Sequence, residues 1–547
     1  MTWQPKTLQQ TLAAAVVARG DSEAVVTQTA RLSFRALAAE VDLLARAMFA
    51  AGLRQGDHVA ILMGNDEHWI SLFFAAASIG AVTVPVNTRF KPAEIAYALK
   101  QADVKALFHA DRFLGIDFTA YLREAEPAID RGLPGRSLPK LALVVTLGGP
   151  PSRAGMAWTA FRALAAKVDA AAFERAVAAV QPDDPLLIQF TSGTTAFPKG
   201  VLLTHANMLR NAWSSGLRIG IRAEDRYFNC RPFFHVGGST LSLLMALSFG
   251  ACLVTLPTFE AGAALRMLAA ERCTLTSGND TIFQMLMGHA DFDRAKLHLR
   301  GGWAAALPQA MTQIIEVMGA KALCNAYGLS EASPNVVISD WRDPEDLRVG
   351  GWMLPHEGVQ VRIADTANGA ALPAGAAGEI QVRGWNVMRG YYNNPEATAK
   401  TFTADGWLKT GDLGEMNAEG RLRMLGRLKD VFRVGGENVA PAEVEDVLHA
   451  HPAVETAQVI GVPDPRLGEV PAAYVKLRAD RTASEAELIA WVKARSANFR
   501  VPRYLRIVES FDSIGMTASG KVQKVKLREQ AIRDFALEAE PAAAVKS

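Results

Sequence analysis

Hydrophobic residues recur along the first part of the chain with two alternating periods. Residues 7–18 and 33–51 repeat apolar positions every three to four residues, which is typical of amphipathic helices. Helices are also predicted at Glu67–Ser78 and Pro92–Lys100, the second with proline in its first turn. Short apolar runs predict strands at His58–Met63, Val82–Val86, Lys105–His109 and Pro185–Ile188. Strands that alternate with helices predict a parallel sheet covered on both faces.

The pattern changes in the second part of the chain. Residues 131–156 are rich in Gly, Pro, Ser and Arg and are predicted to form a surface excursion. From about 345 to 425, short strands between glycine-containing turns predict an antiparallel or barrel-like subdomain. After Lys429 the pattern predicts a small α+β unit, with helices at Pro441–Ala450 and Glu485–Arg495 and strands near Thr456–Gly461 and Ala473–Leu477. We therefore expect an N-terminal domain at 1–428 and a C-terminal domain at 429–547.

Composition narrows the class of protein. The 547 residues are half hydrophobic and carry a net charge of +2, and no basic run favours nucleic acid or a membrane surface. The longest apolar segment, Leu241 to Leu256, is interrupted and short for a membrane span, so it predicts a buried helix and strand. The N-terminus lacks the features of a signal peptide. Four scattered cysteines without paired spacing predict buried thiols, and we expect a cytoplasmic protein.

One stretch, Thr191–Gly200, follows a predicted buried strand and is rich in Thr, Ser and Gly. Such a loop can direct backbone N–H groups, hydroxyls and Lys199 into one concavity, as a polyphosphate requires. A solvated surface turn is the alternative. The loop is not a P-loop, because Lys199 precedes Gly200 and no Ser or Thr follows the lysine.

Further stretches carry weaker signals. Pro232–Gly238 places His235 after two aromatic residues and before two glycines, which suits the wall of an apolar pocket or a core histidine. Tyr327 and Glu331 could stack a base and bind Mg²⁺. Asp412 could accept hydrogen bonds from ribose hydroxyls or merely close an Asx-turn.

Two stretches near the C-terminal unit suggest a hinge between domains and a mobile loop. Gly426–Asp430 combines an arginine for phosphate or ribose with a swivel point, although a charged turn is the alternative. Gly515–Lys521 has the spacing Gly-x4-Gly-Lys, but Val522 follows where a P-loop needs Ser or Thr. What remains is Lys521 on a glycine-flanked loop, a mobile cation for a developing negative charge.

The order and spacing of these stretches resemble the adenylate-forming superfamily, which contains acyl-CoA synthetases, luciferases and non-ribosomal peptide adenylation domains. Met388–Glu396 and Gly378–Ile380 fit the same pattern, and the resemblance covers about residues 8–530. It implies an α/β fold: a large N-terminal domain of two parallel-type α/β sheets plus a small β-barrel-like subdomain, and a small mobile α+β C-terminal domain. It also implies an ATP-dependent acid–CoA ligase that works through an acyl-adenylate, with Mg²⁺ as cofactor and CoA as co-substrate.

The resemblance assigns roles to individual residues. The residues that would bind the phosphates are Thr191, Ser192, Gly193, Thr194, Thr195 and Lys199. Tyr327 would bind adenine, Asp412 would bind ribose, and Arg427 would bind ribose or phosphate. Glu331 would bind Mg²⁺ together with Thr191. Lys521 would neutralise charge during adenylation, and Lys429 would be the hinge that brings the loop of Gly436 to the thiol tunnel. The acyl pocket is expected at His235, Gly237, Asn279, Trp303 and Ala305.

Departures from the family pattern leave the acid open. Trp303 lies in a stretch that is usually Gly-Gly-Ala-Pro-Leu-like, and it is expected to cap or narrow the acyl tunnel. Asn279 replaces part of a Val-Pro-Thr-like wall and could add polarity there. Gly515 stands where proline is common and is expected to loosen the lysine loop. The acid could be fatty, alicyclic or aryl.

Other functions stay open at this point. The enzyme could load a separate carrier protein, act as a luciferase-like monooxygenase, or be a non-catalytic nucleotide-binding relative. The presence of Lys521, Glu331, Asp412 and Arg427 disfavours the last of these. No nucleic acid or integral membrane partner is expected, and a homodimer remains an open alternative.

Overall fold

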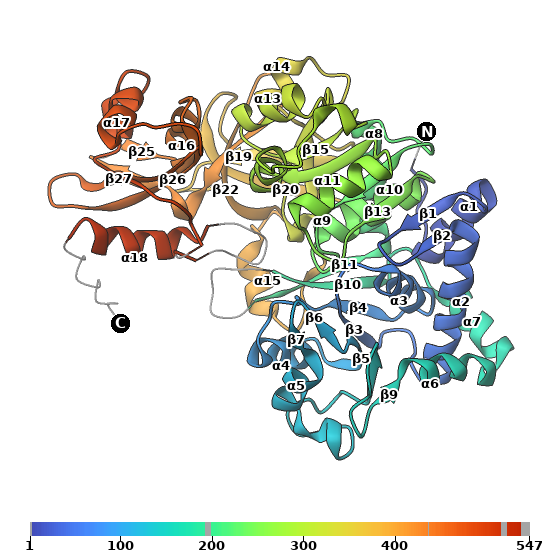
Figure 1. Cartoon of the computed structure of the whole chain (residues 1–547). Coiled ribbons are helices and arrows are strands. Elements are labelled where there is room, and N and C mark those ends of the chain that lie inside the picture. The colour runs from blue at the N-terminus through green and yellow to red at the C-terminus, as the bar shows by residue number, and fades with distance from the viewer. Residues whose placement is uncertain (1–2, 192–197, 436, 513, 516–521, 538–547) are drawn as a thin grey trace.

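The computed structural model describes residues 3–191, 198–435, 437–512, 514–515 and 522–537, and the side chain of Asn438 also lies outside the description. Figure 1 shows two large sheets with their helices, coloured blue to green, and a smaller unit at the C-terminal end, coloured orange to red. The α/β class expected from the pattern is confirmed.

The first large sheet has eight strands in the order β21-β11-β10-β4-β3-β5-β8-β9. They are β3 (His58–Leu62), β4 (Val82–Pro85), β5 (Val104–Ala110), β8 (Leu143–Leu147), β9 (Met156–Ala157), β10 (Pro185–Phe190), β11 (Gly200–Thr204) and β21 (Gly390–Tyr391). The pairs β10–β11 and β11–β21 are antiparallel, and the other neighbouring strands of this sheet pair in parallel. The surface excursion predicted at 131–156 is wrong in part, because β8 is a largely buried strand inside this sheet. Its five consecutive residues Leu-Val-Val-Thr-Leu outweigh the flanking glycines and prolines.

The second large sheet has nine strands in the order β18-β17-β16-β15-β14-β12-β13-β1-β2. They are β1 (Glu23–Val26), β2 (Arg31–Ser33), β12 (Arg226–Asn229), β13 (Cys252–Thr255), β14 (Leu275–Asn279), β15 (Gly301–Ala305), β16 (Ala322–Gly328), β17 (Asn335–Ile338) and β18 (Leu354–Pro355). Its central strands are parallel, whereas β2, β17 and β18 at the two edges are antiparallel.

Helices cover both faces of each large sheet. They are α1 (Leu8–Arg19), α2 (Phe34–Ala50), α3 (Glu67–Ser78), α4 (Pro92–Gln101), α5 (Phe118–Ala125), α6 (Trp158–Ala163), α7 (Ala170–Ala179), α8 (His205–Ile219), α9 (Val236–Gly238), α10 (Met245–Ser248), α11 (Ala261–Ala270), α12 (Asp280–Met287), α13 (Pro308–Val317), α14 (Glu345–Val349) and α15 (Pro395–Thr401). Helix α3 is buried from Trp69 to Ser78. A helix that is apolar all round belongs between layers, and α3 packs in the core that joins the two sheets.

Strand alternation assigns side chains to layers. In β3, Val59 and Ile61 belong to the core between the sheets, and Ala60 and Leu62 to the outer core under α4 and α5. In the second sheet the outer core lies under α11, α12 and α13. The chain therefore stacks helix, sheet, helix, sheet and helix layers, as parallel sheets require.

Two smaller units follow. The stretch predicted as antiparallel or barrel-like is a four-stranded antiparallel sheet, β19 (Val359–Ala364), β20 (Ala377–Gly384), β22 (Leu408–Met416) and β23 (Leu422–Arg427). The last unit contains β24 (Phe432–Val434), β25 (Glu437–Val439), α16 (Pro441–His449), β26 (Val454–Asp464), β27 (Gly468–Leu477), α17 (Glu485–Lys493), β28 (Tyr504–Ile507) and α18 (Lys524–Asp534). It has its own core, from Phe432 to Ala531. Among the helices of the described ranges, none is long and apolar enough to cross a bilayer.

Candidate active site

Three polar side chains meet where the large second sheet abuts the antiparallel sheet. The Tyr327 hydroxyl, at the end of β16, donates a 2.8 Å hydrogen bond to Asp412 Oδ2 on β22. Arg427 faces Asp412 across the β22–β23 pair, and its Nε lies 3.5 Å from Asp412 Oδ1. Burial, and then the Asp412 charge, raise the pKa of Tyr327 well above its ordinary value, so the phenol remains a proton donor. The residues predicted for adenine and ribose are therefore in direct contact.

A second group surrounds a cavity of about 290 Å³. Its lining residues are Leu329, Glu331, Glu379, Tyr391, Lys400, Thr401, Lys409, Thr410 and Gly411. The Tyr391 hydroxyl donates a 2.8 Å hydrogen bond to Glu331 Oε1, and Lys199 Nζ lies 4.9 Å from the centroid of the Tyr391 ring. Burial, followed by the Glu331 charge, raises the pKa of Tyr391. One tyrosine thus joins the predicted metal ligand to the predicted phosphate lysine.

The fold brings these residues together from distant parts of the chain. Tyr391 reaches the eight-stranded sheet because β21 pairs with β11, with Tyr391 opposite Val201. Lys199 immediately precedes β11, and its carbonyl oxygen accepts a 3.0 Å hydrogen bond from the Thr191 N–H. Glu331 lies in the 3₁₀ turn η5 (Ser330–Ala332) after β16, and its carbonyl accepts from the Met388 N–H at 2.8 Å.

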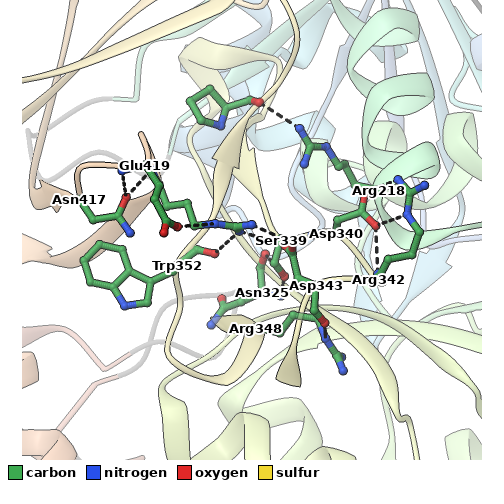
Figure 2. A network of polar contacts seen from close by, with 12 residues as sticks. Arg218, Asn325, Ser339, Asp340, Arg342, Asp343, Arg348, Trp352, Asn417 and Glu419 are labelled. Atoms are coloured by element: carbon green, nitrogen blue, oxygen red, sulfur yellow. Dashed lines mark hydrogen bonds and ion pairs between the residues drawn. The ribbon is translucent and has the colours of Figure 1, made fainter. Parts of the chain in front are cut away.

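A polar network connects the antiparallel sheet with the first half of β16 and the segment after β17 (Figure 2). Arg421, in the turn before β23, donates to both oxygens of Asp343 at 2.8 and 3.0 Å, and only 12% of each side chain is exposed. Arg348 donates to the Asp343 carbonyl at 3.0 Å and to the Leu323 carbonyl at 2.6 Å. Because Leu323 lies on β16, this network holds the strand that ends in Tyr327 against the sheet that carries Asp412.

The residues predicted for the acyl pocket lie nearer the layer between the sheets. Trp303, on β15, is 3% exposed, and its Nε1 donates to the Leu241 carbonyl at 3.3 Å. The Gly237 N–H donates to His235 Nδ1 at 3.1 Å. Asn279 and Ala305 are register partners at the ends of β14 and β15, and the Asn279 side chain accepts from the Ile282 N–H as the N-cap of α12. The pocket role of these five residues remains a prediction.

Several predicted residues lie outside the described ranges. They are Ser192, Gly193, Thr194, Thr195, Gly436 and Lys521. The predicted hinge residue Lys429 is exposed in the 3₁₀ turn η6 (Leu428–Asp430), where partial burial lowers its pKa. Gly515 is described and has φ of 110°, a backbone conformation that proline cannot adopt.

Sequence reasoning did not single out some residues of this site. Tyr391 was part of the matching stretch Met388–Glu396 but received no role, and Lys400, Lys409 and Glu379 received none either. The aromatic pair in Gly390-Tyr391-Tyr392 was the available signal for Tyr391. The lysines gave no signal, because only the fold places them around the Glu331 carboxylate.

The residues present fit Mg²⁺ shared with phosphates. Glu331 and Glu379 bring carboxylates to the cavity, and Mg²⁺ usually takes one or two carboxylates together with substrate phosphates and water. Within the described ranges, no group of three His, Cys, Asp or Glu side chains could hold a metal alone. The four cysteines are free and buried, as predicted, and burial raises the pKa of Cys230 to about 11.

Comparison with known proteins agrees with this geometry. The family model described as AMP-binding enzyme matches residues 12–392, and the model described as AMP-binding enzyme C-terminal domain matches residues 443–521. The first match alone spans more than half of the chain.

Similar proteins are acid–CoA ligases. The chain is 37% identical, over 97% of its length and the whole of the relative, to a Rhodococcus jostii (strain RHA1) CoA ligase named for a propanoyl group on a methyl-dioxo-octahydroindenyl ring system. It is 33% identical to the mitochondrial medium-chain acyl-CoA ligase of Rattus norvegicus, covering 92% of this chain and 84% of that protein.

A solved structure extends the likeness to the fold. The anthranilate CoA ligase AuaEII in complex with anthranoyl-AMP superimposes with a TM-score of 0.83 at 25% identity, covering 98% of this chain and 99% of the other. The chain therefore belongs to the AMP-binding enzyme family, within the adenylate-forming superfamily, and is an AMP-forming acid–CoA ligase.

Proposed function

We propose that the enzyme activates a fatty, alicyclic or aryl carboxylic acid with ATP and transfers the acyl group to CoA. The observation that carries this proposal is the contact of Tyr327, Asp412 and Arg427 beside the cavity of Glu331, Tyr391 and Lys199. Base, ribose and phosphates then have separate partners in one site. The medium-chain relative and the alicyclic relative support acids of these classes without choosing between them.

The chemistry has two steps. A carboxylate oxygen of the acid attacks the α-phosphorus of ATP, and the bond to diphosphate breaks. The CoA sulfur then attacks the acyl carbon, AMP leaves with the electron pair, and the thiol proton goes to solvent. Two anions must approach in the first step, so cations and N–H donors that are already in place contribute most to the rate.

Individual residues have defined parts in this proposal. The Tyr327 ring lies against adenine, Asp412 accepts from the ribose hydroxyls, and Arg427 holds Asp412 in place or contacts phosphate. Lys199 and the Thr191 loop bind the β- and γ-phosphates. Glu331, oriented by Tyr391, holds Mg²⁺, which when bound neutralises phosphate charge.

We also propose that the boundary lies between the domains 1–428 and 429–547, with Lys429 as the hinge. The separate core from Phe432 onward supports this boundary, and the exposed turn at Lys429 suits a change of backbone angles. Rotation there would let Lys521 serve adenylation and the Gly436 loop serve thiol transfer. A cytoplasmic location and a homodimer stay predictions from the sequence.

The decisive experiment measures diphosphate release with CoA across short, medium, long, aryl and alicyclic acids. We expect at least one acid to give stoichiometric diphosphate, AMP and acyl-CoA. Repeating the assay with a carrier protein in place of CoA distinguishes the two possible acceptors of the acyl group. Diphosphate with the carrier protein but no acyl-CoA would contradict CoA as acceptor, and no diphosphate with any acid would favour a non-catalytic relative.

Lys521→Ala tests the division of labour between the two steps. We expect it to abolish acyl-adenylate formation while thioester formation from preformed acyl-adenylate stays largely intact, since the cation is needed only when the two anions meet. Lys526→Ala, close by in α18, is the matched control. Equal loss of both steps would remove Lys521 from its assigned role.

A further inference from the structure

An arginine that none of the roles above uses lies under Trp303. Arg231 follows β12, and its guanidinium carbon lies 4.5 Å from the centroid of the Trp303 indole. Trp303 and Tyr227 both face the core between the two sheets. The half-buried guanidinium therefore lies against a side chain of the core between the sheets.

The part of the chain that the structure describes offers no acceptor to the Arg231 side chain. Its Nε is shielded from solvent and has no hydrogen-bond partner. Within the described ranges, no ion pair or hydrogen bond of its guanidinium is present, and the internal gaps at 192–197, 436, 513 and 516–521 contain no Asp or Glu. A guanidinium stays charged in a protein. Arg231 is half-buried, so its cation keeps accessible N–H donors without a counter-charge among the described residues.

Other arginines of the same sheet differ. Arg226, at the opposite end of β12, lies 2.6 Å from Glu23 and also contacts Glu271. Arg300, just before β15, forms an ion pair with Asp225. Next to Arg231 the titratable neighbours are Cys230 and Tyr227, and burial raises their pKa values to about 11 and about 12, so both are uncharged. The ring of Trp303 attracts the cation, but more weakly than an anion does.

The backbone around Arg231 is held from two sides. Its carbonyl oxygen accepts hydrogen bonds of 2.8 Å from Asn65 Nδ2 and from Asn229 Nδ2. Asn65 Oδ1 also accepts from the Phe233 N–H at 2.8 Å. At Gly237 a Cβ would come within 2.9 Å of Arg231 Nη1, so this glycine leaves room for the guanidinium. The donor fork is thus positioned before any ligand arrives.

Strand register places this cation deep relative to the nucleotide. Trp303 pairs with Cys324 on the parallel neighbour β16, three residues before Tyr327. Three residues of a parallel strand span about 10 Å, so the Trp303 backbone lies about that far behind the Tyr327 backbone along the strand direction. A group bound at Arg231 would belong to the far end of the acid and not to its activated carboxyl.

We propose that Arg231 determines specificity by donating to an oxygen acceptor on the acyl chain, so that the preferred acid carries a second carboxylate or a carbonyl beyond the carboxyl that is activated. This inference rests on the proposed function, since it assigns the acid for the same site. A planar fork of N–H donors matches a carboxylate with two hydrogen bonds and a carbonyl with one or two.

The test compares three acids of equal chain length that end in a methyl group, a ketone or a carboxylate. Diphosphate release with CoA gives kcat/KM for each acid in the wild type, Arg231→Met and Arg231→Lys. We expect the wild type to prefer one oxygenated acid over the methyl-ended acid by about tenfold to a hundredfold, and Arg231→Met to lose that preference. KM for ATP should stay unchanged. The two oxygenated arms distinguish an anion from a neutral carbonyl, and Arg231→Lys should keep more of a carboxylate preference than of a ketone preference.

Arg266→Met, an exposed arginine on α11, is the matched control and should leave all three values unchanged. The inference is overturned if the wild type shows no preference for either oxygenated acid, whether or not the variants fold. It is equally overturned if Arg231→Met lowers kcat/KM for all three acids by the same factor. Absence of diphosphate with every acid in the broad screen is a different result, because it would remove the proposed function itself.

Discussion

The proposed nucleotide end and the proposed acyl end of this site differ in whether their charged groups have partners. At the nucleotide end, Asp412 meets Tyr327 and Arg427, and Glu331 meets Tyr391. At the acyl end, Arg231 meets only the face of Trp303 among the described residues. Charged groups that already have partners in the protein are held in position for ATP, the ligand that every adenylate-forming reaction shares. A charge without a partner indicates that the ligand supplies the missing acceptor. Such an acceptor can be present in one carboxylic acid and absent from another, so it can determine which acid is preferred.

Arg421→Met should give the largest loss of stability, because it removes one partner of a largely buried pair and leaves the Asp340 N–H as the remaining donor to the Asp343 carboxylate among the described residues. We expect a loss of about 3 kcal/mol in the free energy of unfolding, measured by urea titration at pH 7. Arg342→Met is the matched control, since Arg342 is 70% exposed beside Asp340 and should cost less than about 1 kcal/mol. Arg231→Met should cost far less than Arg421→Met without substrate, since it removes a charge that has no counter-charge.

The effect of Arg421→Met depends on pH. Burial, the largest single influence, would raise the pKa of Asp343, but hydrogen bonds from Arg421 and the Asp340 N–H, together with the charges of Arg421 and Arg218, hold this pKa below its ordinary value of 3.8. A lowered carboxyl pKa stabilises the fold above the unfolded pKa, and this contribution is lost as the pH falls through the folded pKa. The difference between the wild type and the variant should therefore be full at pH 7 and shrink below pH 3.8. A difference that does not change with pH would contradict this account of the pair.

Asp412→Asn should change nucleotide binding and leave the acid preference alone. Replacing the charged acceptor should raise KM for ATP by about tenfold to a hundredfold, the usual effect of hydrogen bonds to a charged group. The ratio of kcat/KM between acids should stay constant, which is the opposite of the result expected for Arg231→Met. Asp405→Asn, on an exposed aspartate beside Arg362, serves as control. A shift in acid preference with Asp412→Asn would mean that the two ends of the site are not separate.

Asp446→Asn should give the smallest effect and sharpens the comparison with Arg231. Burial, then the charge of Glu445, raise the pKa of Asp446 from 3.8 to about 7. A raised carboxyl pKa costs no stability below 3.8, and the cost grows until the pH passes about 7. The variant should therefore raise the thermal unfolding temperature at pH 8 and leave it unchanged at pH 3.5. An equal shift at both pH values would point to packing in place of charge.

Asp446 and Arg231 respond differently when their surroundings disfavour a charge. An aspartate whose charge is disfavoured by burial can take up a proton, so Asp446 can exist uncharged without any ligand. An arginine cannot lose its proton under the same pressure, so Arg231 stays a cation.

The fold was largely predictable where the spacing of hydrophobic residues identifies a helix or a strand. The prediction at Glu67–Ser78 matches α3 to the residue, because an uninterrupted apolar stretch follows an N-cap aspartate. Strand β26 is longer than the predicted Thr456–Gly461, because its pairing with β27 continues through Pro463 to Asp464. Proline is tolerated there because β26 is an edge strand.

The site was predictable only where a motif is local. Tyr327, Glu331 and Asp412 were singled out because each lies in a recognisable short stretch, and their roles stay predictions. Tyr391 gained its role from the pairing of β21 with β11, and a two-residue strand has no periodic signal. Arg231 directly precedes the stretch that drew attention to His235, but the lack of an acceptor is a property of three dimensions that the sequence does not display.

The pairing of β21 with β11 also has a consequence for synthesis on the ribosome. Lys199 is translated long before Tyr391, and Asp412 and Arg427 follow later still. The parallel sheets can begin to assemble as they emerge, since domains fold from the N-terminus during translation. The residues proposed for base, ribose and phosphates are all present only once Arg427 has been translated, so we expect ATP to add little stability to a shorter nascent chain. The early layers must therefore hold their shape without help from the nucleotide.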